Sequence, residues 1–78
     1  MKDERTEVAK TIGQFLRDAR EAVGLSQEAL ALRADIHRTY PSLLELGKRQ
    51  PTIDVFLRIC KAVKVEPHVM IRKITTAL

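Results

Sequence analysis

Apolar residues recur along most of the chain at the three- and four-residue spacing of an amphipathic helix. The first segment, residues 8–23, ends before Gly24 and carries its apolar stripe at Val8, Ile12, Phe15, Leu16, Ala19 and Val23. Residues 53–63 repeat the pattern, with a stripe at Ile53, Phe56, Leu57, Cys60 and Val63. No segment alternates between apolar and polar residues as a half-buried strand does. The pattern therefore predicts an all-helical fold.

Residues with special capping or backbone properties mark the ends of these helices. Ser26 and Thr52 are suited to be N-caps, and Pro67 is a natural first residue of a helix. Asp35 tolerates a left-handed conformation, and Lys64 takes a position where glycine would be easier. The last helix carries a stripe at Met70, Ile71, Ile74, Ala77 and Leu78. The chain is thus expected to form five helices, over residues 8–23, 27–34, 38–46, 53–63 and 67–78.

The stretch HRTYPSLLELGKRQPT, residues 37–52, contains a proline where a short helix is expected. One interpretation starts the helix at Arg38 with His37 as its cap, so that Pro41 is the fourth residue. The other starts it at Pro41, after an extended lead-in. We favour the earlier start, because the first turn is where a helix loses least by lacking a backbone N–H. Gly47 ends the helix in either case.

Composition and charge restrict the class of protein. The 78 residues are enough for one domain, and 45% of them are hydrophobic, as in ordinary folded proteins. A single cysteine excludes an internal disulfide, and no apolar run is long enough to span a membrane. The N-terminus lacks the apolar region of a signal peptide. We therefore expect a cytoplasmic protein, associated with the nucleoid if it binds DNA; its net charge of +4 is a mild bias towards polyanions.

Two short helices joined by a tight turn, over residues 27–34 and 38–46, form a helix-turn-helix pattern. The segments IGQFLRDAREAVGLSQEALA, HRTY, SLLE, GKRQPT and ICKAVKV resemble the phage-repressor-type helix-turn-helix family, which includes the small controller proteins of restriction–modification systems. The resemblance runs from about Ile12 to Val65. It implies a compact five-helix bundle of the lambda-repressor-like DNA-binding type. Residues 1–78 would then be one domain, with core helices over 7–65 and a dimerisation helix over 66–78.

The second helix of this pattern, near residues 38–46, is the expected recognition helix, because a helix fits the major groove of B-DNA. Arg38 is the strongest base reader, since its fork matches guanine O6 and N7, although it could instead cap or pair locally. Thr39 and Ser42 are short donors and acceptors for bases or phosphates. Tyr40 belongs to an RTY pattern whose side chains approach DNA in controller proteins, and half-buried packing is its alternative.

Three further residues are expected to contact the DNA backbone. Gln27 stands at the start of the preceding helix, where its amide and the free N–H groups could hold a phosphate. Lys48 and Arg49 follow the recognition helix as phosphate clamps, with solvated loop charges as the alternative. The family resemblance also implies that Arg49 reaches a base. It further implies an ion pair between Arg20 and Glu45 that fixes the recognition helix against the rest of the fold. If the pair is buried, removal of one partner is expected to destabilise the protein by about 3 kcal/mol.

The expected function is that of a homodimeric transcriptional regulator that binds a two-fold symmetric operator. The apolar stripe of the last helix is the expected dimer interface, through Met70, Ile71, Ile74 and Leu78, and closure of the monomer core is its alternative reading. Leu43 and Leu46 depart from the polar residues common in the family. They could contact thymine methyls or bind a protein, as in an antitoxin or adaptor module.

Enzymatic and metal-dependent functions have little support in the sequence. No phosphate loop, nucleophile–base set or carboxylate pair occurs at a convincing spacing, so we expect no enzyme and no cofactor. His37, His68 and Cys60 do not form a metal-ligand set, so no metal site is expected. Cys60 lies on an apolar stripe and is interpreted as a small hydrophobic residue, with redox sensing as the alternative.

Overall fold

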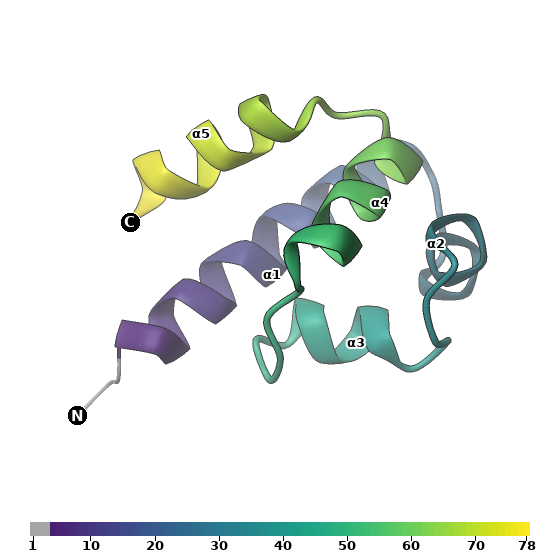
Figure 1. The fold of residues 1–78 in the computed structure, drawn as a ribbon, viewed down its shortest axis with the longest axis horizontal. Coiled ribbons are helices and arrows are strands. Elements are labelled where there is room, and N and C mark those ends of the chain that lie inside the picture. The colour runs from purple at the N-terminus through teal and green to yellow at the C-terminus, as the bar shows by residue number, and fades with distance from the viewer. Residues whose placement is uncertain (1–3) are drawn as a thin grey trace.

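Five helices make up the fold in a computed structural model that describes residues 4–78. Figure 1 shows α3 at the bottom of the view and α5 at the top, with α1 and α4 between them. No strand occurs among these described residues, so the predicted all-α class is confirmed. The helices span Glu4–Ala22 (α1), Gln27–Ala34 (α2), Tyr40–Glu45 (α3), Ile53–Val63 (α4) and Pro67–Ala77 (α5).

The predicted helix ends are confirmed where the signal is local. The Ser26 hydroxyl accepts a hydrogen bond from the Ala29 N–H at 3.0 Å, and that of Thr52 accepts one from the Val55 N–H at 3.2 Å. Pro67 is the first residue of α5. Helices α1 to α4 are each followed, within two residues, by a residue with a positive φ: Gly24, Asp35, Gly47 and Lys64.

A single hydrophobic core lies between the helices, and α4 contributes most to it. This helix packs against α1, α2 and α5, while α3 packs against α1 and α2. The buried cluster comprises Leu16, Leu25, Leu30, Ala34, Leu44, Val55, Phe56, Ile59, Cys60, Val63, Met70 and Ile74. Helix α2 packs through a face of small and apolar residues, since Leu30, Ala31 and Ala34 are buried.

The predicted buried faces of α1 and α4 are partly wrong. Val23 is 39% exposed, whereas the buried residues of α1 are Ala9, Gly13, Leu16 and Arg20. In α4, Ile53 and Leu57 are 72% and 46% exposed, and Val55 and Ile59 are buried instead. The physical reason is that each helix has an apolar or small-residue arc wider than the face its neighbours cover. Periodicity alone does not tell which edge of that arc is left outside.

The expected role of α5 as an interface also needs a correction. Met70 and Ile74 are 1% and 4% exposed and belong to the core of the monomer, so they are not available to a partner. Ile71 and Leu78 are 45% and 61% exposed, at the outer edge of the same apolar stripe. The apolar surface of α5 is therefore divided between closing the core and facing outward.

Candidate nucleic-acid interface

Helices α2 and α3 are joined by a five-residue connection whose geometry is held by backbone bonds and by α4. Asp35 ends α2 in the left-handed conformation, with φ 54° and ψ 53°. The Ile36 N–H donates to the Ala31 carbonyl at 3.0 Å. Arg58 of α4 donates to the Ala34 and Asp35 carbonyls at 3.1 and 2.7 Å. Carbonyl groups at the end of a helix have no intrahelical partner, so Arg58 caps the end of α2. The sequence reading missed this capping role of Arg58, because nothing local links it to α2.

The start of the recognition helix differs from both interpretations of the sequence. Helix α3 begins at Tyr40, not at Arg38 and not at Pro41. Arg38 and Thr39 lie in a turn that the Tyr40 N–H closes by donating to the His37 carbonyl at 2.9 Å. Pro41 is therefore the second helical residue, where a missing N–H breaks no helical hydrogen bond.

His37 and Thr39 stabilise this turn through their side chains. The Thr39 N–H donates to His37 Nδ1 at 3.2 Å, and Thr39 Oγ1 lies 2.8 Å from the same nitrogen. His37 thus caps the turn before the helix. Pro41 is buried, which fixes the N-terminal end of α3 against the core. The residues that precede Pro41 therefore have a defined position.

The recognition helix is tied to the rest of the fold by a buried ion pair. Arg20 Nε lies 2.7 Å from Glu45 Oε2, and Arg20 Nη2 lies 2.9 Å from Glu45 Oε1, in a bidentate arrangement. Arg20 Nη1 also donates to the Leu25 carbonyl at 2.7 Å. The hydrogen bond to Glu45 raises the pKa of the Arg20 guanidinium above its usual value. Both side chains are at most 10% exposed, so the pair is largely removed from water.

Gln27 takes part in the same network. Its Nε2 donates to Glu45 Oε1 at 3.1 Å, so the first residue of α2 is linked to the last residue of α3. The sequence suggested a phosphate contact for this side chain, and the observed bond gives its amide a partner within the protein. The N-terminus of α2 keeps its position relative to α3 through this bond.

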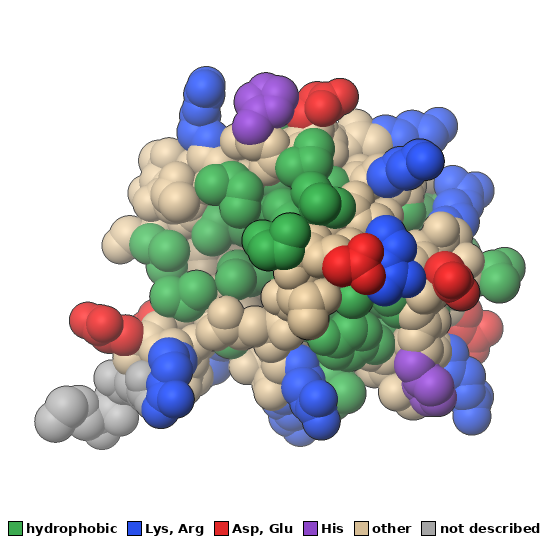
Figure 2. Space-filling view, in the orientation of Figure 1, with side chains coloured by type: hydrophobic (Ala, Val, Ile, Leu, Met, Phe, Trp, Pro, Cys, Tyr) green, Lys and Arg blue, Asp and Glu red, His purple; other side chains and the backbone are tan. Residues whose placement is uncertain are grey.

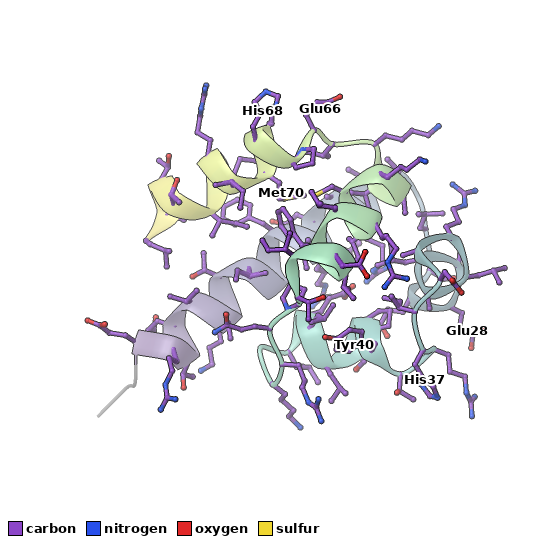
Figure 3. The ribbon with its side chains drawn as sticks, in the orientation of Figure 1. Glu28, His37, Tyr40, Glu66, His68 and Met70 are labelled. Atoms are coloured by element: carbon purple, nitrogen blue, oxygen red, sulfur yellow. The ribbon has the colours of Figure 1, made fainter. Side chains whose placement is uncertain are left out.

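The predicted DNA-contacting residues differ in how exposed they are. Arg38, Thr39, Lys48 and Arg49 are exposed, and Ser42 is half-buried. Tyr40 is half-buried against the core, and its hydroxyl lies 3.5 Å from the Gln50 carbonyl. Figure 3 shows Tyr40 on the side of α3 that faces α4, whereas His37 projects away from the core, from the connection that precedes α3. These contacts favour the packing alternative for Tyr40.

The loop after α3 is folded back onto the helix. The N–H groups of Lys48 and Arg49 both donate to the Leu43 carbonyl, at 2.9 and 3.3 Å. These hydrogen bonds fix the backbone of Lys48 and Arg49 relative to the C-terminal end of α3. Figure 2 shows Lys and Arg side chains along the lower edge of the molecule, where α3 and this loop lie in Figure 1.

Other chemistry is weakly represented in the part of the chain that the structure describes. Residues 4–78 hold no cluster of three or more His, Cys, Asp or Glu side chains that could bind a metal. No helix among the same residues is long and apolar enough to cross a membrane. Cys60 is fully buried, and burial raises the pKa of its thiol to about 11. It is therefore a thiol packed in the core at neutral pH.

Comparison with known protein families identifies a helix-turn-helix domain over residues 11–72. Two uncharacterised helix-turn-helix transcriptional regulators of Mycobacterium tuberculosis are each 38% identical over 58 residues. These residues are 74% of this chain but 41% of each relative, so the chain spans less than half of their length. The control protein C.BamHI of Bacillus amyloliquefaciens is 43% identical over 56 residues, which cover 70% of this chain and 69% of that protein.

A solved structure agrees with these matches. The restriction–modification controller protein C.AhdI from Aeromonas hydrophila has a TM-score of 0.76 to this fold at 34% identity. The superposition covers 82% of this chain and 96% of the controller protein.

Proposed function

The chain belongs to the helix-turn-helix family of DNA-binding transcriptional regulators, and on that premise we propose that it binds a two-fold symmetric operator sequence-specifically as a homodimer. The observation that carries the proposal is the position of α3. This helix is locked to the scaffold by the Arg20–Glu45 pair, while Arg38 and Thr39 at its start and Lys48 and Arg49 at its end are exposed. A rigid helix with free polar ends can enter a groove without rearrangement.

Within this proposal, Arg38 reads a base and the residues after α3 hold the backbone. Arg38 precedes the first helical residue, at the end that enters the major groove in helix-turn-helix proteins. Its guanidinium presents a fork of donors to guanine. Lys48 is fixed at the opposite end of α3 by its backbone bond to Leu43, which suits a contact with phosphate. Thr39 and Ser42 are supporting contacts, and Tyr40 acts mainly by packing.

Variants of these two residues separate the roles. We expect Arg38→Ala to relax preference at one base-pair position of each half-site by about 1–3 kcal/mol. Lys48→Ala should weaken binding to all sequences alike and reduce the salt slope by about one unit per bound protomer, because one phosphate contact is lost. The measurement is a binding titration on a preferred duplex and its single-base variants at several salt concentrations. The same effect for both variants would contradict the assigned roles.

The dimer interface is proposed at exposed apolar positions of α4 and α5. Figure 2 shows hydrophobic side chains gathered over these two helices. Ile53 and Leu57 are one turn apart on α4, so they share a face of that helix. Ile71 lies on α5, and Leu78 directly follows the last residue of α5 about two turns further along the same face. A second copy of the chain would cover these side chains. Two copies are also needed functionally, because one six-residue helix can read only a few base pairs.

Exposed apolar surface near α3 supports a second candidate function. Leu46 is 59% exposed at the end of the recognition helix, and Leu43 is half-buried one turn before it. In a DNA complex, both could contact thymine methyl groups. In an antitoxin or adaptor module, they would instead bind a protein. The two functions differ in an observable way, because a protein-binding module has no need for saturable, sequence-dependent binding to duplex DNA.

A further inference from the structure

A hollow of about 320 Å³ lies between the first turns of α1 and the loop that follows α3. Among residues 4–78, three of the side chains that line it are basic and none is acidic; this lining comprises Arg5, Thr6, Ala9, Gly47, Lys48, Arg49 and Gln50. The expected phosphate clamps, Lys48 and Arg49, thus share a concave site with α1. The sequence pattern could not indicate this, because the two segments are about forty residues apart.

The two walls of the hollow are held close together by backbone contacts. A Cβ on Gly47 would lie 2.7 Å from Lys10 Cγ and 3.0 Å from Lys10 Cα, and Gly47 has a φ of +73°. Only glycine combines that backbone conformation with so close an approach. Gln50 Nε2 donates to the Arg5 carbonyl at 3.3 Å, which joins the loop directly to the first turn of α1. The hollow is therefore formed before any ligand arrives.

The acidic side chains at the start of α1 line a different surface. Glu4 and Glu7 line a separate hollow with Val8 and Leu78, whereas Arg5, Thr6 and Ala9 line the basic one. The first turns of α1 thus divide their charge between two sides. Figure 2 shows Lys and Arg side chains at the lower edge, over the start of α1 and the loop after α3. Among the described lining residues, an anion at this place would meet three basic side chains and no carboxylate.

We propose that this site, which we call the basic cradle (Arg5, Thr6, Lys48, Arg49 and Gln50), binds a phosphate of the DNA backbone. The inference rests on the proposed function and extends it to α1, for which no DNA contact was expected. Arg5, Lys48 and Arg49 supply positive charge, and the Thr6 hydroxyl and Gln50 amide are neutral donors.

The position of the cradle matches where a phosphate is expected. Helix α3 has six residues and is therefore about 9 Å long. The major groove is about 12 Å wide. With Arg38 over the bases at one end of α3, the loop at the other end lies near a wall of the groove, which is made of phosphates. The cradle opens next to that loop, so α1 reaches the backbone there.

The test is Arg5→Ala, with Lys73→Ala as the control of equal charge. Lys73 is an exposed residue of α5 and lines a hollow to which α3 contributes no residue. Binding to a duplex selected by the wild-type protein is titrated at several salt concentrations. We expect Arg5→Ala to reduce the slope of log affinity against log salt by about one unit per bound protomer, and Lys73→Ala to leave it unchanged. Circular dichroism confirms that both variants are folded.

A second arm locates the contact on the DNA. Single phosphates of the selected duplex are replaced, one at a time, by neutral methylphosphonates. One position in each half-site should weaken binding by the wild-type protein more than binding by Arg5→Ala, because Arg5 no longer contributes to the contact with that phosphate. Equal slopes for Arg5→Ala and Lys73→Ala, or the same phosphate effects in wild type and Arg5→Ala, would overturn the cradle while leaving the regulator proposal intact. Absence of saturable duplex binding by the wild-type protein would overturn both.

Discussion

Glu45→Ala is expected to destabilise the protein by about 3–5 kcal/mol, because it leaves the Arg20 guanidinium buried without its counter-charge. Arg20 is 8% exposed, and after the substitution the Leu25 carbonyl is its remaining partner among the bonds described above. Gln27 also loses its bond to the carboxylate. For a domain of this size such a loss is a large fraction of total stability. Urea unfolding followed by circular dichroism measures it.

The same helix offers a matched control for this experiment. Arg17 and Glu21 form an ion pair at 3.5 Å with both side chains more than half exposed. Glu21→Ala should cost less than about 0.5 kcal/mol, since exposed pairs contribute little. The double variant Arg20→Met with Glu45→Leu should regain much of the lost stability, because it removes both buried charges. A Glu45→Ala variant as stable as Glu21→Ala would contradict a structural role for the pair.

Gly13→Ala is expected to cost at least about 3 kcal/mol, at the upper end of what overpacking costs. A Cβ on Gly13 would clash with the Leu44 carbonyl oxygen and would lie 2.9 Å from that of Glu45. These are backbone atoms of α3, so the whole recognition helix would have to move away from α1. Thermal and urea unfolding measure the loss, and a weaker preference among duplex sequences should accompany it.

The sign of this effect separates packing from helix propensity. Alanine is the better helix former by about 1 kcal/mol, so an effect on α1 alone would stabilise the protein. Gln14→Ala, at the exposed neighbouring position, is the control and should change stability by less than about 0.5 kcal/mol. A Gly13→Ala variant as stable as the wild type would show that α1 and α3 do not meet as closely as described.

The parts of the fold that the sequence predicts well depend on local interactions. Ser26 and Thr52 are N-caps through bonds to residues three positions away, and Asp35 and Lys64 adopt the expected left-handed conformation. The parts that it misses depend on packing between distant segments. Ile53 is exposed because its edge of α4 has no neighbour, and this cannot be read from the spacing of α4. Gly13 carries no hydrophobic signal, yet it sets the α1–α3 distance.

The candidate site divides in the same way. The residues at the two ends of α3 can be predicted from the helix-turn-helix pattern, because their positions follow from the helix itself. The first turn around Pro41 could not be settled, since the choice depends on the turn that His37 and Tyr40 close. Arg5 and the loop after α3 come together only in the folded protein. A sequence pattern therefore does not predict that they line the same site.

The central claim is sequence-specific binding to a two-fold symmetric DNA site, and selection from a random duplex pool tests it most directly. We expect the wild-type protein to enrich a two-fold symmetric motif with half-site centres about 34 Å apart. Leu57→Glu, which places a charge in the proposed dimer interface, should lose the symmetric motif and at most retain a half-site. Absence of any enriched sequence with the wild-type protein at moderate salt would contradict the account.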